Sequence, residues 1–94
     1  MISDLYDQVA AAATTAAATA EPSAAEALTD VADAIRDRRF PVGPPNRRGL
    51  FPPPQADLSG LFAVRVATAM HRRDAAAAYE LASVARKFGL TPGL

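Results

Sequence analysis

The sequence contains no cysteine, and this absence excludes a whole group of chemistries. Disulfide bonds, thiol nucleophiles, cysteine-ligated zinc and iron–sulfur clusters all require cysteine sulfur. His71 is the only histidine, and it falls near the expected end of a helix, where a cation suits the helix dipole. No glycine-rich phosphate loop is present either. We therefore expect no cofactor, no metal site and no enzymatic activity.

Long hydrophobic runs are also lacking. No stretch reaches the ~18 strongly apolar residues that a membrane span needs, and the run over 10–20 contains only alanine and threonine. The N-terminus lacks the basic start and the leucine-rich core that are typical of a signal peptide. These features predict a cytoplasmic protein without membrane contact.

Lysine is nearly absent, because nine of the ten basic residues are arginine and only Lys87 is lysine. Together with the abundance of alanine and proline, this usage is typical of a high-GC genome. An actinobacterium, or a phage that infects one, is the source that the composition favours.

Large apolar side chains are few for a chain of 94 residues, which is the size of one small domain. Half of the residues count as hydrophobic, but many of these are alanine, which removes little apolar area from water. At ~25 cal/mol per Å² of buried apolar surface, such a core has little margin over the chain entropy that folding costs. We therefore expect self-association, most simply as a homodimer.

The formal net charge is zero, yet the two signs are separated along the chain. The first 34 residues carry six acidic residues and no basic one, whereas the remainder carries ten basic and four acidic residues, so the halves have charges of −6 and +6. Such a separation can steer a charged partner. It can also be neutralised when two chains meet head to tail or when the halves pack together, and packing within one chain is the interpretation we favour.

Helical spacing of the apolar residues predicts four helices, over residues 4–20, 24–38, 58–72 and 75–88. Ser3 is expected to cap the first helix. Ser23, followed by Glu26, has the pattern of a capping box and predicts the start of the second helix. The fold class is therefore all-α, with four helices arranged as two hairpins.

The second helix is expected to carry a row of acidic side chains on one face, formed by Glu26, Asp30, Asp33 and Asp37. Such a row can bind a basic partner or a divalent cation. It is also what a solvated helix face looks like, and no adjacent histidine favours metal. We interpret the row as a solvated face.

The third helix, with Asp57 as its expected cap, is apolar on most sides, because Arg65, Thr68 and Arg72 form its only polar stripe. A helix of this kind is predicted to lie at the centre of the fold. Asp74 is expected to cap the fourth helix. That helix is expected to stop at Gly89, in a C-terminal turn closed by an apolar contact.

A proline-rich crossover, the strap, is expected over 40–56 between the two hairpins, and six of the eight prolines fall between 41 and 54. Proline fixes φ, so the strap should be semi-rigid and able to present side chains. Arginine and aromatic side chains are enriched at binding hot spots. We expect the partner-binding residues to be Arg38, Arg39, Phe40, Arg47, Arg48, Leu50 and Phe51. A plain connection without a binding role is the competing interpretation.

These observations predict a non-enzymatic module for protein–protein interaction. A small adaptor and an inhibitor of a larger bacterial protein both fit this description, and a phage protein aimed at a host target is one form of the latter. The alternative is nucleic-acid binding through four basic pairs, Arg38/Arg39, Arg47/Arg48, Arg72/Arg73 and Arg86/Lys87. The zero net charge and the lack of aromatic residues interleaved with the arginines disfavour this alternative.

Overall fold

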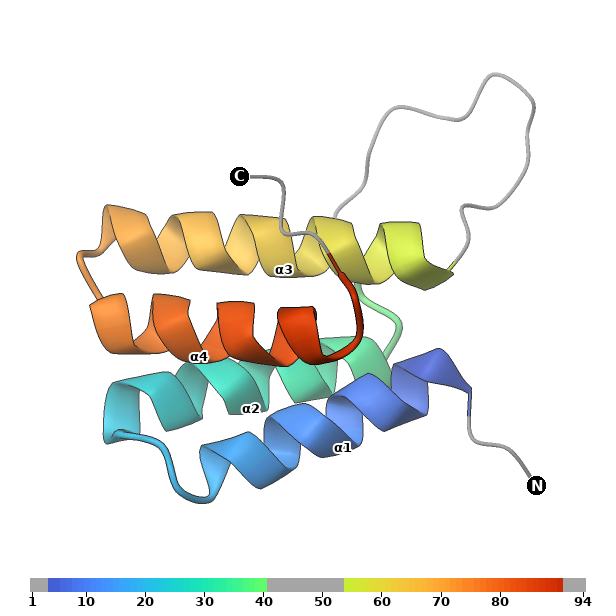
Figure 1. Ribbon diagram of the computed structural model, residues 1–94, viewed down its shortest axis with the longest axis horizontal. Helices are drawn as coiled ribbons and strands as arrows, with labels where there is room; N and C mark the ends of the chain where they lie inside the picture. Colours follow the sequence, from blue (N-terminus) through green and yellow to red (C-terminus); the bar gives the residue numbers. More distant parts are fainter. Residues whose placement is uncertain (1–3, 41–53, 91–94) are drawn as a thin grey trace.

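The computed structural model describes residues 4–40 and 54–90, and these residues form four helices. The helices are α1 (Leu5–Ala17), α2 (Pro22–Arg36), α3 (Pro54–His71) and α4 (Ala75–Lys87). α1 packs against α2, and α3 packs against α4, as two antiparallel hairpins (Figure 1). The prediction of an all-α fold built from two hairpins is confirmed. Most of the predicted strap, over 41–53, lies outside the described residues.

The two hairpins meet through α2 and α4, which lie side by side in the middle of the bundle and run in the same direction (Figure 1). One apolar core draws residues from all four helices, and its largest fully buried side chains are Phe62, Leu28, Ile35, Leu58, Leu61, Leu81, Val9 and Val31. Within the described ranges no polar or charged residue is buried. None of the helices in these ranges is long and apolar enough to cross a membrane.

The prediction that the third helix is the central one is wrong. α3 packs mainly on α4, and Val64 and Met70 on α3 remain 48% and 55% exposed. Alanine explains the arrangement, because Ala24 of α2, Ala69 of α3 and Ala77 of α4 form a small buried cluster of their own. Small side chains allow neighbouring helices to approach closely, so α4 packs on both α2 and α3 despite its modest hydrophobicity, although its Tyr79 is 64% exposed. α3 is left on the outside with apolar side chains in solvent.

α2 begins two residues before the predicted start, and the predicted capping box is not formed. Glu21 is the N-cap residue, without a side-chain capping bond, and Pro22 occupies the first turn. Proline favours that position because its fixed φ is already helical and its missing N–H has no partner there anyway. Ser23 therefore lies inside the helix, where its hydroxyl donates to Asp74 Oδ1 across the hairpin interface at 3.4 Å.

The bounds of α1 and α3 also differ from prediction, and the largest difference is four residues, at the start of α3. Asp4 caps α1 by accepting a hydrogen bond from the Asp7 N–H at 2.9 Å, and Ser3 lies outside the described residues. α1 ends at Ala17 instead of continuing to residue 20. α3 begins at Pro54, so Asp57 stands in its first turn and is not the cap. The last three residues of the predicted strap are therefore helical.

Both predicted ends of α4 are confirmed. The Asp74 carboxylate accepts a hydrogen bond from the Ala77 N–H at 3.0 Å and caps the helix. Gly89 has a φ of +69°, and the following N–H, that of Leu90, donates to the Ala85 carbonyl at 2.9 Å. This is a Schellman turn, in which glycine takes the left-handed position and a buried apolar residue follows it.

Arginine occupies the left-handed position after α2 and after α3. Arg38 has a φ of 55° and Arg73 a φ of 59°. In both turns the next N–H returns to the carbonyl five residues earlier at 2.8 Å, as it does after α4. A residue with a Cβ is disfavoured at this φ by roughly 1 to 2 kcal/mol, so glycine or asparagine would be expected at these positions. No pattern in the sequence predicts that these two arginines adopt a left-handed conformation.

Candidate functional site

The two ends of the predicted strap are held by one tyrosine on α1. The Tyr6 ring lies 5.3 Å from the Phe40 ring, centroid to centroid, at an interplanar angle of 37°. The Tyr6 hydroxyl donates a hydrogen bond to Asp57 Oδ2 at 2.8 Å. Phe40 is the last described residue before 41–53, and Asp57 lies in the first turn after it. We call Tyr6, Arg38, Phe40 and Asp57 the Tyr6 cluster.

Arg38 stabilises this cluster from the end of α2. Its guanidinium carbon lies 4.4 Å from the centre of the Tyr6 ring, which is a cation–π contact. Its Nη1 donates to the Ile35 carbonyl at 2.8 Å, and its Nη2 lies 3.3 Å from Asp4 Oδ2 and 3.9 Å from Asp7 Oδ1. The same residue therefore links the start of α1 to the end of α2. These contacts explain why arginine is placed at an unfavourable φ.

The environment of Tyr6 changes its acid–base behaviour. Burial, and next the hydrogen bond to Asp57, raise the pKa of the Tyr6 phenol above its usual value of 10.0. The neutral phenol is the form that donates to Asp57, so the hydrogen bond and the protonated state support each other. The link between α1 and α3 therefore persists throughout the neutral range of pH.

The structure describes three of the seven predicted partner-binding residues. Arg38 and Phe40 belong to the Tyr6 cluster, so both have a packing role. Arg39 is exposed, and its Nε lies 3.4 Å from Asp37 Oδ2. The other four, Arg47, Arg48, Leu50 and Phe51, lie outside the described residues. Contact of any of the seven with a partner stays a prediction.

A shallow groove of about 290 Å³ lies between the residues that follow α2 and one side of α3. Its lining combines the end of the first hairpin with one side of α3, namely Arg39, Phe40, Leu61, Val64, Arg65 and Thr68. Val64 is the exposed apolar residue in this set. The groove therefore places an arginine and an exposed valine beside Phe40, the last described residue before 41–53.

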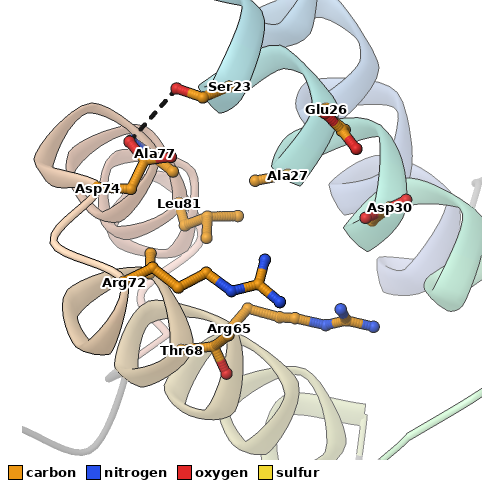
Figure 2. A pocket seen from close by; sticks show the side chains of 11 residues that line it. Ser23, Glu26, Ala27, Asp30, Arg65, Thr68, Arg72, Asp74, Ala77 and Leu81 are labelled. Carbon is orange, nitrogen blue, oxygen red and sulfur yellow. Dashed lines mark hydrogen bonds between the residues drawn. The ribbon is translucent and has the colours of Figure 1, made fainter.

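A second hollow, of about 180 Å³, lies between α2 and α3, and residues of α4 form part of its lining. We call it the charged cleft. Ala27, Ala69, Ala77 and Leu81 supply its apolar lining. Its charged walls are Glu26 and Asp30 on α2 and Arg65 and Arg72 on α3, and Asp74, the cap of α4, adds a carboxylate at one end. Figure 2 shows the two guanidinium groups side by side on the α3 side and the two carboxylates on the α2 side.

The charged residues of this cleft belong to two separate patterns in the sequence. Glu26 and Asp30 are half of the predicted acidic row, and Arg65 and Arg72 are the charged members of the predicted polar stripe of the third helix. The other half of the row is used differently, because Asp33 pairs with Arg36 at 3.6 Å and Asp37 pairs with Arg39. Sequence spacing places each row on a helix face. It does not reveal that the two faces meet.

The basic pairs do not form one continuous face in the described part of the chain. Arg72/Arg73 lie at the turn between α3 and α4, at one end of the bundle. Arg38/Arg39 and Arg86/Lys87 lie at the other end, where α2 and α4 finish (Figure 1). A protein that follows a phosphate backbone needs its cations along one stripe. This placement gives the nucleic-acid alternative no added support.

Comparison of this chain with protein-family models, with curated proteins and with solved structures found no match.

Proposed function

We propose that this chain is a non-enzymatic protein-interaction module that recognises a larger protein through the residues joining its two hairpins. The observation that carries the proposal is that Tyr6 contacts residues on both sides of 41–53, through the Phe40 ring and the Asp57 carboxylate. A binding loop whose two ends are fixed loses less conformational entropy when it meets a partner. Loops on a rigid scaffold are where binding residues concentrate.

The chemistry of the joining residues supports recognition of a protein surface. The sequence of 38–51 combines four arginines, arranged in two pairs, with two phenylalanines and a leucine, which is the composition of an interaction hot spot. The groove beside Arg39 and Phe40 adds the exposed Val64 to this surface. A cytoplasmic adaptor or inhibitor of a larger bacterial protein, phage-encoded forms included, is the role we assign to it.

Capture of a partner followed by titration tests the proposal. The tagged chain is used to capture proteins from a lysate of a high-GC actinobacterium treated with nuclease, and the captured protein is then produced pure. The dissociation constant is measured with wild type, Phe51→Ala, and the double variant Arg47→Ala/Arg48→Ala. Loss of hot-spot residues should weaken binding by roughly 30-fold or more.

Arg86→Ala/Lys87→Ala is the matched control, because this exposed basic pair lies on α4, outside 38–51. It should leave the affinity within about twofold, since exposed charges outside the contact set contribute little even when they lie at the same end of the bundle. Equal weakening by both double variants would contradict the proposal, because it would indicate nonspecific attraction by charge. Recovery of nucleic acid alone when nuclease is omitted, with binding that falls steeply with salt, would favour the nucleic-acid alternative instead.

A further inference from the structure

Four charged residues of the charged cleft have no ion-pair partner in the part of the chain that the structure describes. Elsewhere in the first hairpin, four aspartates lie 3.3 to 3.9 Å from an arginine of the same hairpin. No ion pair is formed there by Glu26 and Asp30 on α2 or by Arg65 and Arg72 on α3, although all four line one hollow. The acidic and the basic groups therefore face the same space without contact.

These residues form two stripes of opposite sign that run along the cleft. Glu26 and Asp30 are one helical turn apart on α2, and Arg65 and Arg72 are two turns apart on α3. α2 and α3 run in opposite directions along the two sides of the cleft (Figure 1). Figure 2 shows the acidic stripe on one side and the basic stripe on the other.

A face with two parallel stripes of opposite sign is complementary to a copy of itself. A two-fold axis that runs along the cleft exchanges its two sides, so the basic stripe of one copy comes to lie over the acidic stripe of the other. The acidic stripe of each copy contacts the basic stripe of the other, so the same contact occurs twice, as in every isologous dimer interface. The long arginine side chains span the distance between the two copies better than the shorter acidic ones.

We propose that the charged cleft is the interface of a homodimer, in which Arg65 and Arg72 of each copy pair with Glu26 and Asp30 of the other. This inference goes beyond the proposed recognition of a partner protein, which uses 38–51 and not the cleft. The apolar lining of the cleft, Ala27, Ala69, Ala77 and Leu81, lies between its two charged walls. The interface thus combines complementary charge with apolar area inside the cleft.

Charge reversal on one wall at a time tests the proposal with the full chain. Glu26→Arg/Asp30→Arg makes both walls basic, and Arg65→Glu/Arg72→Glu makes both walls acidic. Sedimentation velocity and light scattering should show a dimer for wild type. Each variant alone should be monomeric where wild type is dimeric, with association weakened at least about 100-fold by like-charge contacts. An equimolar mixture of the two variants should form a 1:1 heterodimer.

The control is Arg73→Glu/Arg86→Glu, which changes the net charge as much as Arg65→Glu/Arg72→Glu but at residues that do not line the cleft. It should dimerise like wild type, and circular dichroism should show that every variant remains helical. Wild type that is monomeric at about 1 mM overturns the proposal, because a weaker contact has no use in a cell. Reversal variants that dimerise normally, or a mixture that stays monomeric, overturn it as well.

Discussion

In the first hairpin, Arg36, Arg38 and Arg39 each lie 3.3 to 3.9 Å from a carboxylate of the same hairpin, whereas the second hairpin shows no such pair among residues 54–90. The arginines of the first hairpin connect α1 to α2 and form ion pairs and hydrogen bonds at the C-terminal end of α2. The basic residues of the second hairpin instead face solvent or the charged cleft.

This difference shows where the acidic and basic residues, which are separated along the sequence, lie in the folded chain. Three of the four ion pairs in the described ranges join an aspartate of the acidic first 34 residues to an arginine of the basic remainder, in line with the neutralisation we favoured, yet all four lie within the first hairpin. Opposite charges of the two hairpins do line the same cleft, but no ion pair joins them in the described ranges. The hairpins are held together by apolar packing, helped by a side-chain hydrogen bond at each end, Tyr6 to Asp57 and Ser23 to Asp74.

The largest expected effect tests whether the second hairpin depends on apolar burial alone. Phe62 is fully buried in the common core, so Phe62→Ala should lower the free energy of unfolding by ~3 to 5 kcal/mol. Val64→Ala on the same helix is the control, because Val64 is 48% exposed, and it should cost less than ~0.5 kcal/mol. Urea denaturation measures both. Similar losses for the two variants would mean that α3 is covered on both sides.

The second prediction concerns the link between Ser23 and Asp74 at the far end of the bundle from the Tyr6 cluster. Asp74→Ala removes both the cap of α4 and this link, and should cost ~1 to 2 kcal/mol. Ser23→Ala removes only the exposed link and should cost less than ~0.5 kcal/mol. Thermal denaturation followed by circular dichroism compares the two variants. A loss above ~1 kcal/mol for Ser23→Ala would mean that Ser23 caps α2, as its sequence pattern predicts, and would contradict the start of α2 in the structure.

The two left-handed arginines allow the sharpest comparison of the hairpins. Glycine relieves the unfavourable φ at either position, but only Arg38 has side-chain contacts to lose. We expect Arg73→Gly to raise the free energy of unfolding by about 0.5 kcal/mol. Arg38→Gly should lower it by about 1 kcal/mol, because the lost cation–π and ionic contacts outweigh the relief. A gain of stability in Arg38→Gly as large as that in Arg73→Gly, measured by denaturation, would show that the Arg38 contacts contribute nothing.

The last comparison, whose effect is similar in size but depends on pH, is that of wild type with Tyr6→Phe. Loss of the hydrogen bond to Asp57 should cost ~0.5 to 1.5 kcal/mol at neutral pH. Because folding raises the pKa of the Tyr6 phenol, the contribution is fully present below the unfolded value of 10.0 and is lost as pH rises through the folded pKa. The stability difference between wild type and Tyr6→Phe should therefore shrink above pH 10.0. A difference that stays constant with pH would mean that the bond does not respond to ionisation of the phenol.

Local signals predicted much of this fold. Apolar spacing located four helices and two hairpins, and Asp74 and Gly89 marked both ends of α4. These features depend on neighbours within one helical turn, which a single sequence displays directly. The start of α2 was mispredicted because Pro22 and Ser23 are both good starting residues, and only the packed structure shows which of them begins the helix.

The candidate sites were less predictable, because their members are distant in sequence. Tyr6 and Asp57 are 51 positions apart, and so are Ser23 and Asp74. No spacing rule connects such residues. The choice of Arg38 for a left-handed position makes sense only once Tyr6 lies beneath its guanidinium group.

By itself, the sequence determined the helical content, the hairpins and the separation of charge, since these follow from local propensity and composition. The tertiary structure decided that α2 and α4 are central, that α3 exposes apolar side chains, and that an acidic and a basic stripe share one cleft. The physical reason is that alanine is compatible with both buried and exposed helix faces. In an alanine-rich chain, therefore, the few large side chains and their mutual packing select the arrangement.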